Sequence, residues 1–567
     1  MPVCPTNRRE MNAFCLFAIA ISLTGISAQS GPTITTPSGQ IQGTVESCGL
    51  FCTYYSFKGI PYAQPPVGNL RFRNPVSHPG WSGVRDAAQH GSFCPQYELL
   101  TLEVIGDEDC LYLNVYSPEL IGQRPVMVWM HGGAYSSGSG DSDVYDPQKL
   151  IREGVVVVTI NYRLGALGFL STNDEHAQGN WGLKDCIEAL RWVQRNIAAY
   201  GGDPDNVTIF GNSAGGSLVH FLYLSDMANG LFHKAIAQSG TALAPFAFQT
   251  NPKFYADRFA NIFGLSSDSA VYVDQLRTLP ASSFIPFQEA LLTIPVPRFM
   301  RPLDFAPSTE PASSPESRAL TTDPMSLMRS RQHTVPFLMG YNDLEGSFFT
   351  TVEFAVDQTV FDQFNNNPDL FVPFFWNINT GSPASSAVSS AFQQHYFNNQ
   401  QLGLPLFFEW SKYYGDHLFL FPVHYTAQVH AQSLAPVYYY QFSYDGDLNL
   451  FKKSLGITLP GAIHVDEIPY LFELAEEMGA EVPPGSHAIT VSDRMVRMWA
   501  NFAKYSDPTP SSDSLLQNLV WPTIQESSNG VAMMDIGQNL MVTDASTSET
   551  FVLWHRLQDQ YATNPFL

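Results

Sequence analysis

Continuous apolar runs alternate along this chain with segments of helical periodicity. Residues 125–130 are a continuous apolar run, and residues 154–160 are apolar except for Thr159; both are typical of strands buried on both faces of a sheet. Between Leu183 and Ile197 the apolar residues recur at spacings of three and four, which predicts a helix that runs to about Ala199. Buried strands that alternate with helices predict a parallel sheet covered by helices on both faces.

The N-terminal part of the chain has a different pattern. Residues 34–45 and then residues 53–57 are predicted to form an antiparallel pair of strands. Cys48 and Cys52 lie at the turn between them, where they could close a small local disulfide. Much further along the chain, residues 335–340 form another short apolar run and end in a glycine.

One apolar run ends in a motif with chemical meaning. Residues 207–211 lead into Gly211-Asn212-Ser213-Ala214-Gly215, and the residues that follow predict the start of a helix. A strand, one tight turn with Gly-x-Ser-x-Gly, and a helix form the sequence pattern of a nucleophile elbow. The two outer glycines let strand and helix pack closely, and Ser213 would lie at the positive end of the helix dipole. A glycine- and serine-rich loop also matches five residues, so other parts of the chain must decide.

Composition and charge exclude several classes of protein. The chain has 567 residues, of which 44% are hydrophobic and 14% charged, so it lacks the low hydrophobicity and high charge of disordered proteins. The formal net charge is −23 with no basic stripe, which argues against nucleic acid and anionic membranes as partners.

The N-terminus has the features of a secretory signal peptide. Arg8 and Arg9 precede an apolar stretch at residues 13–23, which is too short to span a bilayer, and small residues follow as far as Ala28. We therefore expect residues 1–28 to be removed and the mature chain to be secreted and extracellular. No later apolar run is long enough for a transmembrane anchor.

Five cysteines remain after the expected cleavage, so at least one has no partner within the chain. Cys186 lies in the predicted helix at an apolar position, which favours a buried and inert thiol. No second cysteine or histidine lies near it at ligand spacing, so we expect no metal site.

A serine nucleophile needs a base and an acid, and in elbow enzymes the chain order is serine, acid, histidine. After the apolar run at 335–340, Asp343 and Glu345 are both candidates for the acid. Several later histidines satisfy the order, and His464 differs from the others because it lies in a Gly- and Pro-rich loop before an acidic helix start.

Four blocks of sequence now identify a family. The chain resembles the type-B carboxylesterases of the carboxylesterase/cholinesterase family, most of all the secreted esterases of arthropods. The blocks that carry the resemblance are residues 108–114, 161–169, 179–185 and 201–215. It implies an α/β-hydrolase fold with a large, mostly parallel central sheet, helices on both faces and long inserted loops that form an active-site gorge. It also implies one domain over residues 29–567.

The resemblance assigns roles to individual positions. Ser213 matches the nucleophile, Glu345 the acid and His464 the general base. The backbone N–H groups at three other positions match the oxyanion hole: Gly133, Ala134 and Ala214. Ala134 replaces the usual glycine, which keeps the N–H donor but narrows the space over the acyl carbon. No metal or other cofactor is implied.

Further matches are architectural. The family pattern implies a disulfide between Cys94 and Cys110 and a buried serine at Ser239 that supports the acid. It also implies two buried ion pairs, Arg71 with Glu108 and Arg163 with Asp185.

Two departures from the family bear on the substrate. Asn212 stands where the family usually has glutamate, and the loop between Cys94 and Cys110 has no tryptophan to bind a quaternary amine. Both favour neutral, apolar carboxylic esters over choline esters. A juvenile-hormone-type esterase or an esterase that degrades pheromones or odorants fits the same departures. Asn206 begins a glycosylation sequon, although its place beside the elbow strand favours an unmodified asparagine.

A second class of function stays open in this family, since some members are adhesion proteins that have lost the catalytic residues. The intact set of Ser213, Glu345 and His464 and the absence of an anchor sequence favour the enzyme. A lipase would need an amphipathic lid, for which the sequence has no strong signal. The expected partner is a small-molecule ester.

Overall fold

The computed structural model describes residues 29–49, 51–98, 103–286, 300–330, 333–474, 482–527, 530–563 and 565–566. The expected signal peptide, residues 1–28, lies outside these ranges. Within them, no helix combines the length and the apolar character that a bilayer crossing requires.

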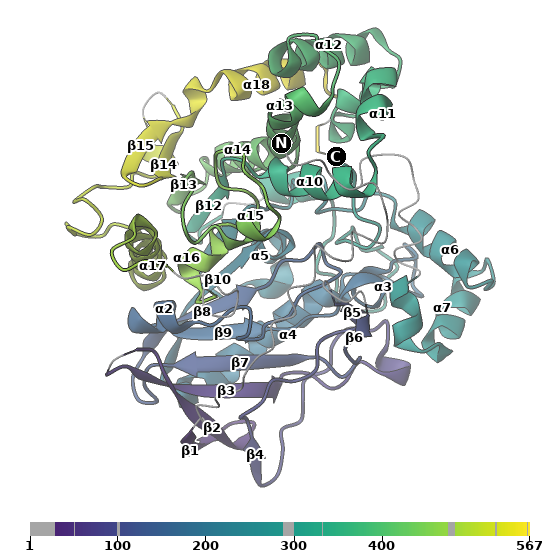
Figure 1. The fold of residues 1–567 in the computed structure, drawn as a ribbon. Coiled ribbons are helices and arrows are strands. Elements are labelled where there is room, and N and C mark those ends of the chain that lie inside the picture. Colours follow the sequence, from purple (N-terminus) through teal and green to yellow (C-terminus); the bar gives the residue numbers. More distant parts are fainter. Residues whose placement is uncertain are drawn as a thin grey trace.

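The described residues form a sheet of 13 strands with a parallel centre and antiparallel flanks (Figure 1). The central strands, in spatial order, are β9 (Val156–Ile160), β8 (Arg124–Met130), β10 (Gly202–Asn212), β11 (Lys234–Gln238), β12 (Phe337–Asn342), β13 (Val437–Phe442) and β14 (Ala532–Ile536), and neighbouring members pair in parallel. On one flank lie β7 (Tyr112–Ser117), β3 (Thr53–Pro61), β2 (Gly39–Ser47) and β1 (Gln29–Thr36); β15 (Leu540–Asp544) closes the other, and β4 (Val84–Asp86) pairs with β2.

Both faces of the central strands are buried. Along β8, Val128 and Met130 belong to one hydrophobic core, whereas Trp129 belongs to a second core on the opposite face. The first core includes side chains of α4 (Trp181–Asn196) and α5 (Ala214–Leu224), and the second includes those of α17 (His487–Tyr505). The parallel sheet with helices on both faces that the apolar runs predict is therefore present, in the arrangement that the family resemblance implies. The carboxyl ends of its parallel strands are the edge where functional side chains gather.

One element differs from the prediction. Residues 34–45 are not a single strand, because β1 ends at Thr36 and β2 begins at Gly39, and the two pair antiparallel. Pro37 and Ser38 make the turn between them, and both residue types favour turns. The predicted helix after Leu183 is α4, and its continuation as far as Tyr200 is a 3-10 turn, η2 (Ile197–Tyr200).

The architectural pairs of the sequence analysis are formed. Disulfides join Cys48 to Cys52 and Cys94 to Cys110, and Cys186 is a free and buried thiol. The guanidinium of Arg71 contacts the Glu108 carboxylate at 2.5 Å, and that of Arg163 contacts Asp185 at 2.7 Å.

Candidate active site

The elbow motif forms a sharp turn between β10 and α5. Ser213 has φ 59° and ψ −124°, a conformation that strains any residue with a Cβ. Its N–H donates to the carbonyl of Gln238 at 2.8 Å, which ties the turn to the end of β11. A Cβ on Gly215 would overlap the carbonyl oxygen of Met130, so this close approach of helix to strand requires glycine.

Glu345 and His464 meet in the interior although they are 119 residues apart in the chain. Nδ1 of His464 lies 2.6 Å from Oε2 of Glu345, and the two residues are 3% and 0% exposed. Glu345 follows β12 and precedes α10 (Gly346–Val356), and His464 lies in the loop before α16 (Ile468–Leu471). The backbone N–H of Asn342 donates to Oε1 of the same carboxylate at 2.8 Å. Both oxygens of Glu345 are thus engaged, and the imidazole is held in one orientation.

Ser213 is placed at the same edge of the sheet but is not hydrogen-bonded to His464. Among the interactions of the described residues, none uses the Ser213 hydroxyl. Hydrogen bonds between a nucleophile and its base are often long without substrate and tighten when substrate binds. The structure therefore brings the acid and the histidine together and leaves the serine free.

Aromatic rings enclose the imidazole of His464. The ring centroid of Phe419 lies 4.6 Å from it and that of Phe349 lies 5.0 Å from it. Phe349 follows the acid on α10, whereas Phe419 comes from a π-helical turn, η9 (Asp416–Leu420), which the sequence analysis did not predict. Single π-helical turns are frequent at functional sites.

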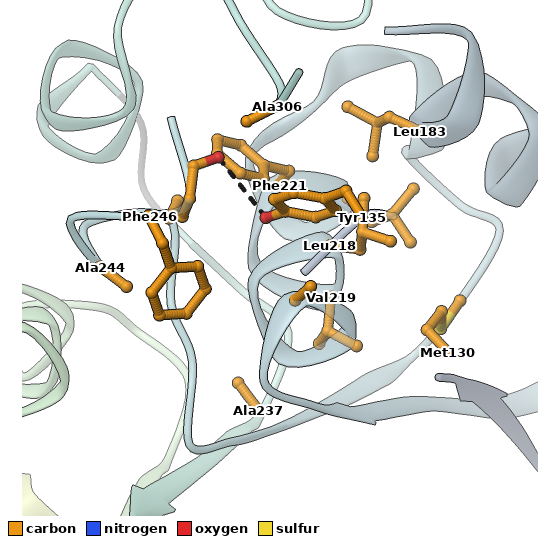
Figure 2. Close-up of a cluster of buried hydrophobic side chains, with 14 of the residues drawn as sticks. Met130, Tyr135, Leu183, Leu218, Val219, Phe221, Ala237, Ala244, Phe246 and Ala306 are labelled. Atoms are coloured by element: carbon orange, nitrogen blue, oxygen red, sulfur yellow. Dashed lines mark hydrogen bonds between the residues drawn. The ribbon is translucent and has the colours of Figure 1, made fainter. Parts of the chain in front are cut away.

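The three expected oxyanion donors make no hydrogen bond within the part of the chain that the structure describes. They are the backbone N–H groups of Gly133, Ala134 and Ala214. Ala134 has φ 53°, so the loop after β8 is strained at this residue. Tyr135 anchors the loop, because its ring is buried against α5 and its hydroxyl donates to the carbonyl of Ala247 at 3.5 Å, drawn dashed in Figure 2.

Asn212 has a partner that the sequence analysis missed. Its side chain is 2% exposed, and Nδ2 donates to Oε1 of Glu467 at 2.6 Å. Glu467 is fully buried and lies three residues after His464. The polar residues Gln238 and Asn342, which end the buried strands β11 and β12, contact the same carboxylate. Polar residues at the ends of buried strands are the signal that could have indicated this cluster.

The remaining candidates have other environments. Asp343 accepts from the N–H of Ala462 at 2.7 Å and does not reach His464, and burial raises the pKa of its carboxyl to about 6. The hydroxyl of Ser239 is buried and has no hydrogen-bond partner among the described residues, so the expected support of the acid is not formed there. The side-chain oxygen of Asn206 accepts from Nζ of Lys234. Among the described residues, no group of three or more potential ligands could hold a metal ion.

Comparison with known proteins identifies the family. The model of the carboxylesterase family matches residues 30–554. Acylcarnitine hydrolase of Mus musculus is 33% identical over 501 residues, which cover 85% of this chain and 84% of the relative. Juvenile hormone esterase of Heliothis virescens is 31% identical over 518 residues, which cover 88% of each chain. Esterase E4 of Myzus persicae is 34% identical over 512 residues, which cover 86% of this chain and 89% of that one.

A solved structure supports the same relationship. The crystal structure of juvenile hormone esterase from Manduca sexta, with OTFP covalently attached, superposes with a TM-score of 0.82. It is 28% identical and covers 94% of this chain and 100% of its own. The chain belongs to the carboxylesterase family, and it is a hydrolase of carboxylic esters with an α/β-hydrolase fold.

Proposed function

We propose that this protein is a serine carboxylesterase that acts on neutral, apolar esters through Ser213, His464 and Glu345. The observation that carries the proposal is the buried 2.6 Å contact between His464 and Glu345. It leaves Nε2 of the imidazole as the ring nitrogen available to take the serine proton. The strained turn at Ser213 supports the role of nucleophile, since strain of this kind is common at active sites.

The reaction follows from these positions. His464 takes the proton of the Ser213 hydroxyl as Oγ attacks the ester carbonyl carbon, and Glu345 stabilises the imidazolium that forms. The free N–H groups of Gly133, Ala134 and Ala214 would receive the negative charge on the carbonyl oxygen. The imidazolium then gives its proton to the departing alcohol. Water, deprotonated by the same imidazole, releases the carboxylic acid and restores Ser213.

The preference for uncharged esters rests on the loop between Cys94 and Cys110, which has no tryptophan to bind a quaternary amine, and on the neutral amide of Asn212, which stands before the nucleophile where the family usually has a carboxylate. An ester with a quaternary amine would gain no ionic contact from this residue. Two of the similar proteins are juvenile hormone esterases, so an ester of that hormone is one candidate for the physiological substrate.

We also propose that the mature chain is secreted. The apolar N-terminal segment with its preceding arginines supports this, and so do the two disulfides, which persist in oxidising compartments. Asn206 is the candidate for glycosylation, and its contact with Lys234 favours an unmodified side chain. An adhesion protein without activity is the alternative, and the intact Ser213, His464 and Glu345 oppose it.

A panel of esters with graded acyl length, assayed with the wild type and Ser213→Ala, tests the proposal. We expect neutral apolar esters to be hydrolysed, choline esters to be turned over at least about 100-fold more slowly, and Ser213→Ala to lose about 10⁴-fold or more in kcat. Retained activity in Ser213→Ala would refute the mechanism. Efficient turnover of choline esters would refute the substrate class, and no activity toward any ester would favour the adhesion alternative.

A further inference from the structure

A second carboxylate lies within the candidate active site. Glu467 is fully buried, and the structure gives it no Lys or Arg partner among the described residues. Three neutral amides surround it instead. Nδ2 of Asn212 and Nε2 of Gln238 approach Oε1 at 2.6 and 3.1 Å, and Nδ2 of Asn342 approaches Oε2 at 2.7 Å.

The orientation of two of these amides is fixed independently of Glu467. The indole N–H of Trp499 donates to Oε1 of Gln238 at 3.0 Å, so the Gln238 nitrogen must point away from it and toward the carboxylate. Nδ2 of Asn342 also donates to the carbonyl of Ile463 at 2.8 Å, which identifies that atom as nitrogen. Glu467 therefore faces N–H donors, which favour the ionised form of a carboxyl group.

Two of the amides connect Glu467 to residues of the proposed reaction. Asn212 is the residue before the nucleophile, and the N–H of Asn342 holds the acid Glu345. Glu467 itself begins the turn into α16, three residues after His464. A shift of this carboxylate would move the serine turn, the acid and the histidine loop together.

The charges around Glu467 oppose one another. Burial and the nearby Glu345 raise the pKa of its carboxyl group, whereas the Asn342 amide and His464 act in the opposite direction. The other titratable groups that interact with it are Asp466, Tyr145 and Tyr440. A carboxylate at position 212 would add a like charge 2.6 Å away and force the pair to share a proton. The neutral Asn212 avoids this.

We propose that Glu467 is a positioning residue for His464, and that Asn212 keeps it ionised beside the nucleophile. This inference rests on the proposed function, since it takes His464 as the general base. The negative charge of Glu467 adds to that of Glu345 in stabilising the imidazolium of His464. Asn212 thus serves the catalytic base and does not act as a contact for the substrate.

Two variants test the proposal through the pH dependence of kcat/KM on a small uncharged ester. Glu467→Gln removes the charge, so the imidazolium is less stable, and we expect the acid limb to move down by about half a pH unit or more. We also expect kcat to fall about tenfold with KM within about twofold. Asn212→Ala removes one donor to Oε1, so Glu467 gains its proton more easily and its charge is lost over part of the pH range. We therefore expect the acid limb of Asn212→Ala to move down as well, but by less than that of Glu467→Gln.

A shift of the acid limb, large in Glu467→Gln and smaller in Asn212→Ala, distinguishes this role from a loss of packing, which would lower kcat without moving the acid limb. Asp466→Asn is the matched control, because Asp466 is also fully buried but binds Asn449 and the N–H groups of Lys452 and Ile463. We expect its acid limb to stay at the wild-type position. Acid limbs of Glu467→Gln and Asn212→Ala that coincide with the wild type, or that move up, would overturn the inference. Activity in Ser213→Ala would instead overturn the proposed function.

Discussion

Ser213, the proposed nucleophile, has a backbone conformation that favours glycine. Its φ of 59° and ψ of −124° cost on the order of 1–3 kcal/mol for a residue with a Cβ. We therefore expect Ser213→Gly to be more stable than Ser213→Ala by about 1 kcal/mol, although neither variant should be active. Urea unfolding followed by circular dichroism measures the difference.

Ser217, one turn further along α5, gives the matched control. Its hydroxyl donates to the carbonyl of Thr241, and it lies in regular helix, where alanine is favoured over glycine by about 1 kcal/mol. Ser217→Gly should accordingly be the less stable of the two variants at that position. If the alanine variant were also the more stable one at Ser213, the backbone at Ser213 would not be strained.

At the level of single residues, the sequence indicated candidate side chains but not the contacts among them. Local pattern alone left Asp343 and Glu345 as equal candidates for the acid, and the family resemblance selected Glu345, which is the carboxylate that meets His464. The bond from Asn212 to Glu467 joins residues 255 positions apart. Periodicity and spacing cannot predict such a contact, because the contact depends on how loops after different strands converge.

At the scale of elements, the elbow depends on how closely α5 approaches β8. A Cβ at Gly215 would overlap the backbone carbonyl of Met130, which cannot move without disturbing the sheet. We expect Gly215→Ala to lower the free energy of unfolding by about 2–4 kcal/mol and to abolish most activity. Thermal unfolding together with ester hydrolysis measures both effects.

Gly403 is a suitable control for this substitution. Its φ of −178° is extended backbone that any residue adopts, and a Cβ there would meet only Pro405 at 3.7 Å. Gly403→Ala should change stability by less than about 0.5 kcal/mol. If Gly215→Ala were as harmless as Gly403→Ala, the close packing would not be what the elbow requires.

Elements with a strong pattern were predictable, and those shaped by tertiary contacts were not. The apolar runs of β8, β9 and β12 gave their strands, whereas the turn at Pro37 divides the predicted first strand in two. The π-helical turn η9 had no periodic signal. It comes directly before α14 (Phe421–His430), where Pro422 lacks the N–H that a regular helix would use. That wide turn places Phe419 on the ring of His464.

At the scale of the whole molecule, two groups of buried titratable side chains have opposite effects on how stability depends on pH. Burial lowers the pKa of His220, His417 and His424 to about 3, so these histidines remain neutral in the fold. Burial raises the pKa of Asp416 and Asp466 to about 7. As the pH falls below about 6.5, the histidines disfavour the folded state, while the aspartates favour it, so their effects on stability partly cancel.

Replacing one of these aspartates should show how its contribution to folding stability depends on pH. Asp416 accepts from the hydroxyl of Tyr396 at 2.6 Å, and asparagine keeps an acceptor there. The folded pKa of Asp416, about 7, lies above the ordinary value of 3.8. Its contribution to stability is therefore present at low pH and is lost as the pH rises from about 4 to 7, because only the unfolded chain releases the proton in that range.

We accordingly expect Asp416→Asn to gain stability relative to the wild type as the pH rises from 5 to 8, by roughly 2–3 kcal/mol. Urea unfolding at each pH measures this difference. Asp357 is the control, since hydrogen bonds from Thr359 lower the pKa of its carboxyl group. The effect of Asp357→Asn on stability should therefore stay constant from pH 5 to 8. A constant difference for Asp416→Asn as well would mean that Asp416 is already ionised in the fold at pH 5, and that its bond with Tyr396 is enough to hold a buried charge.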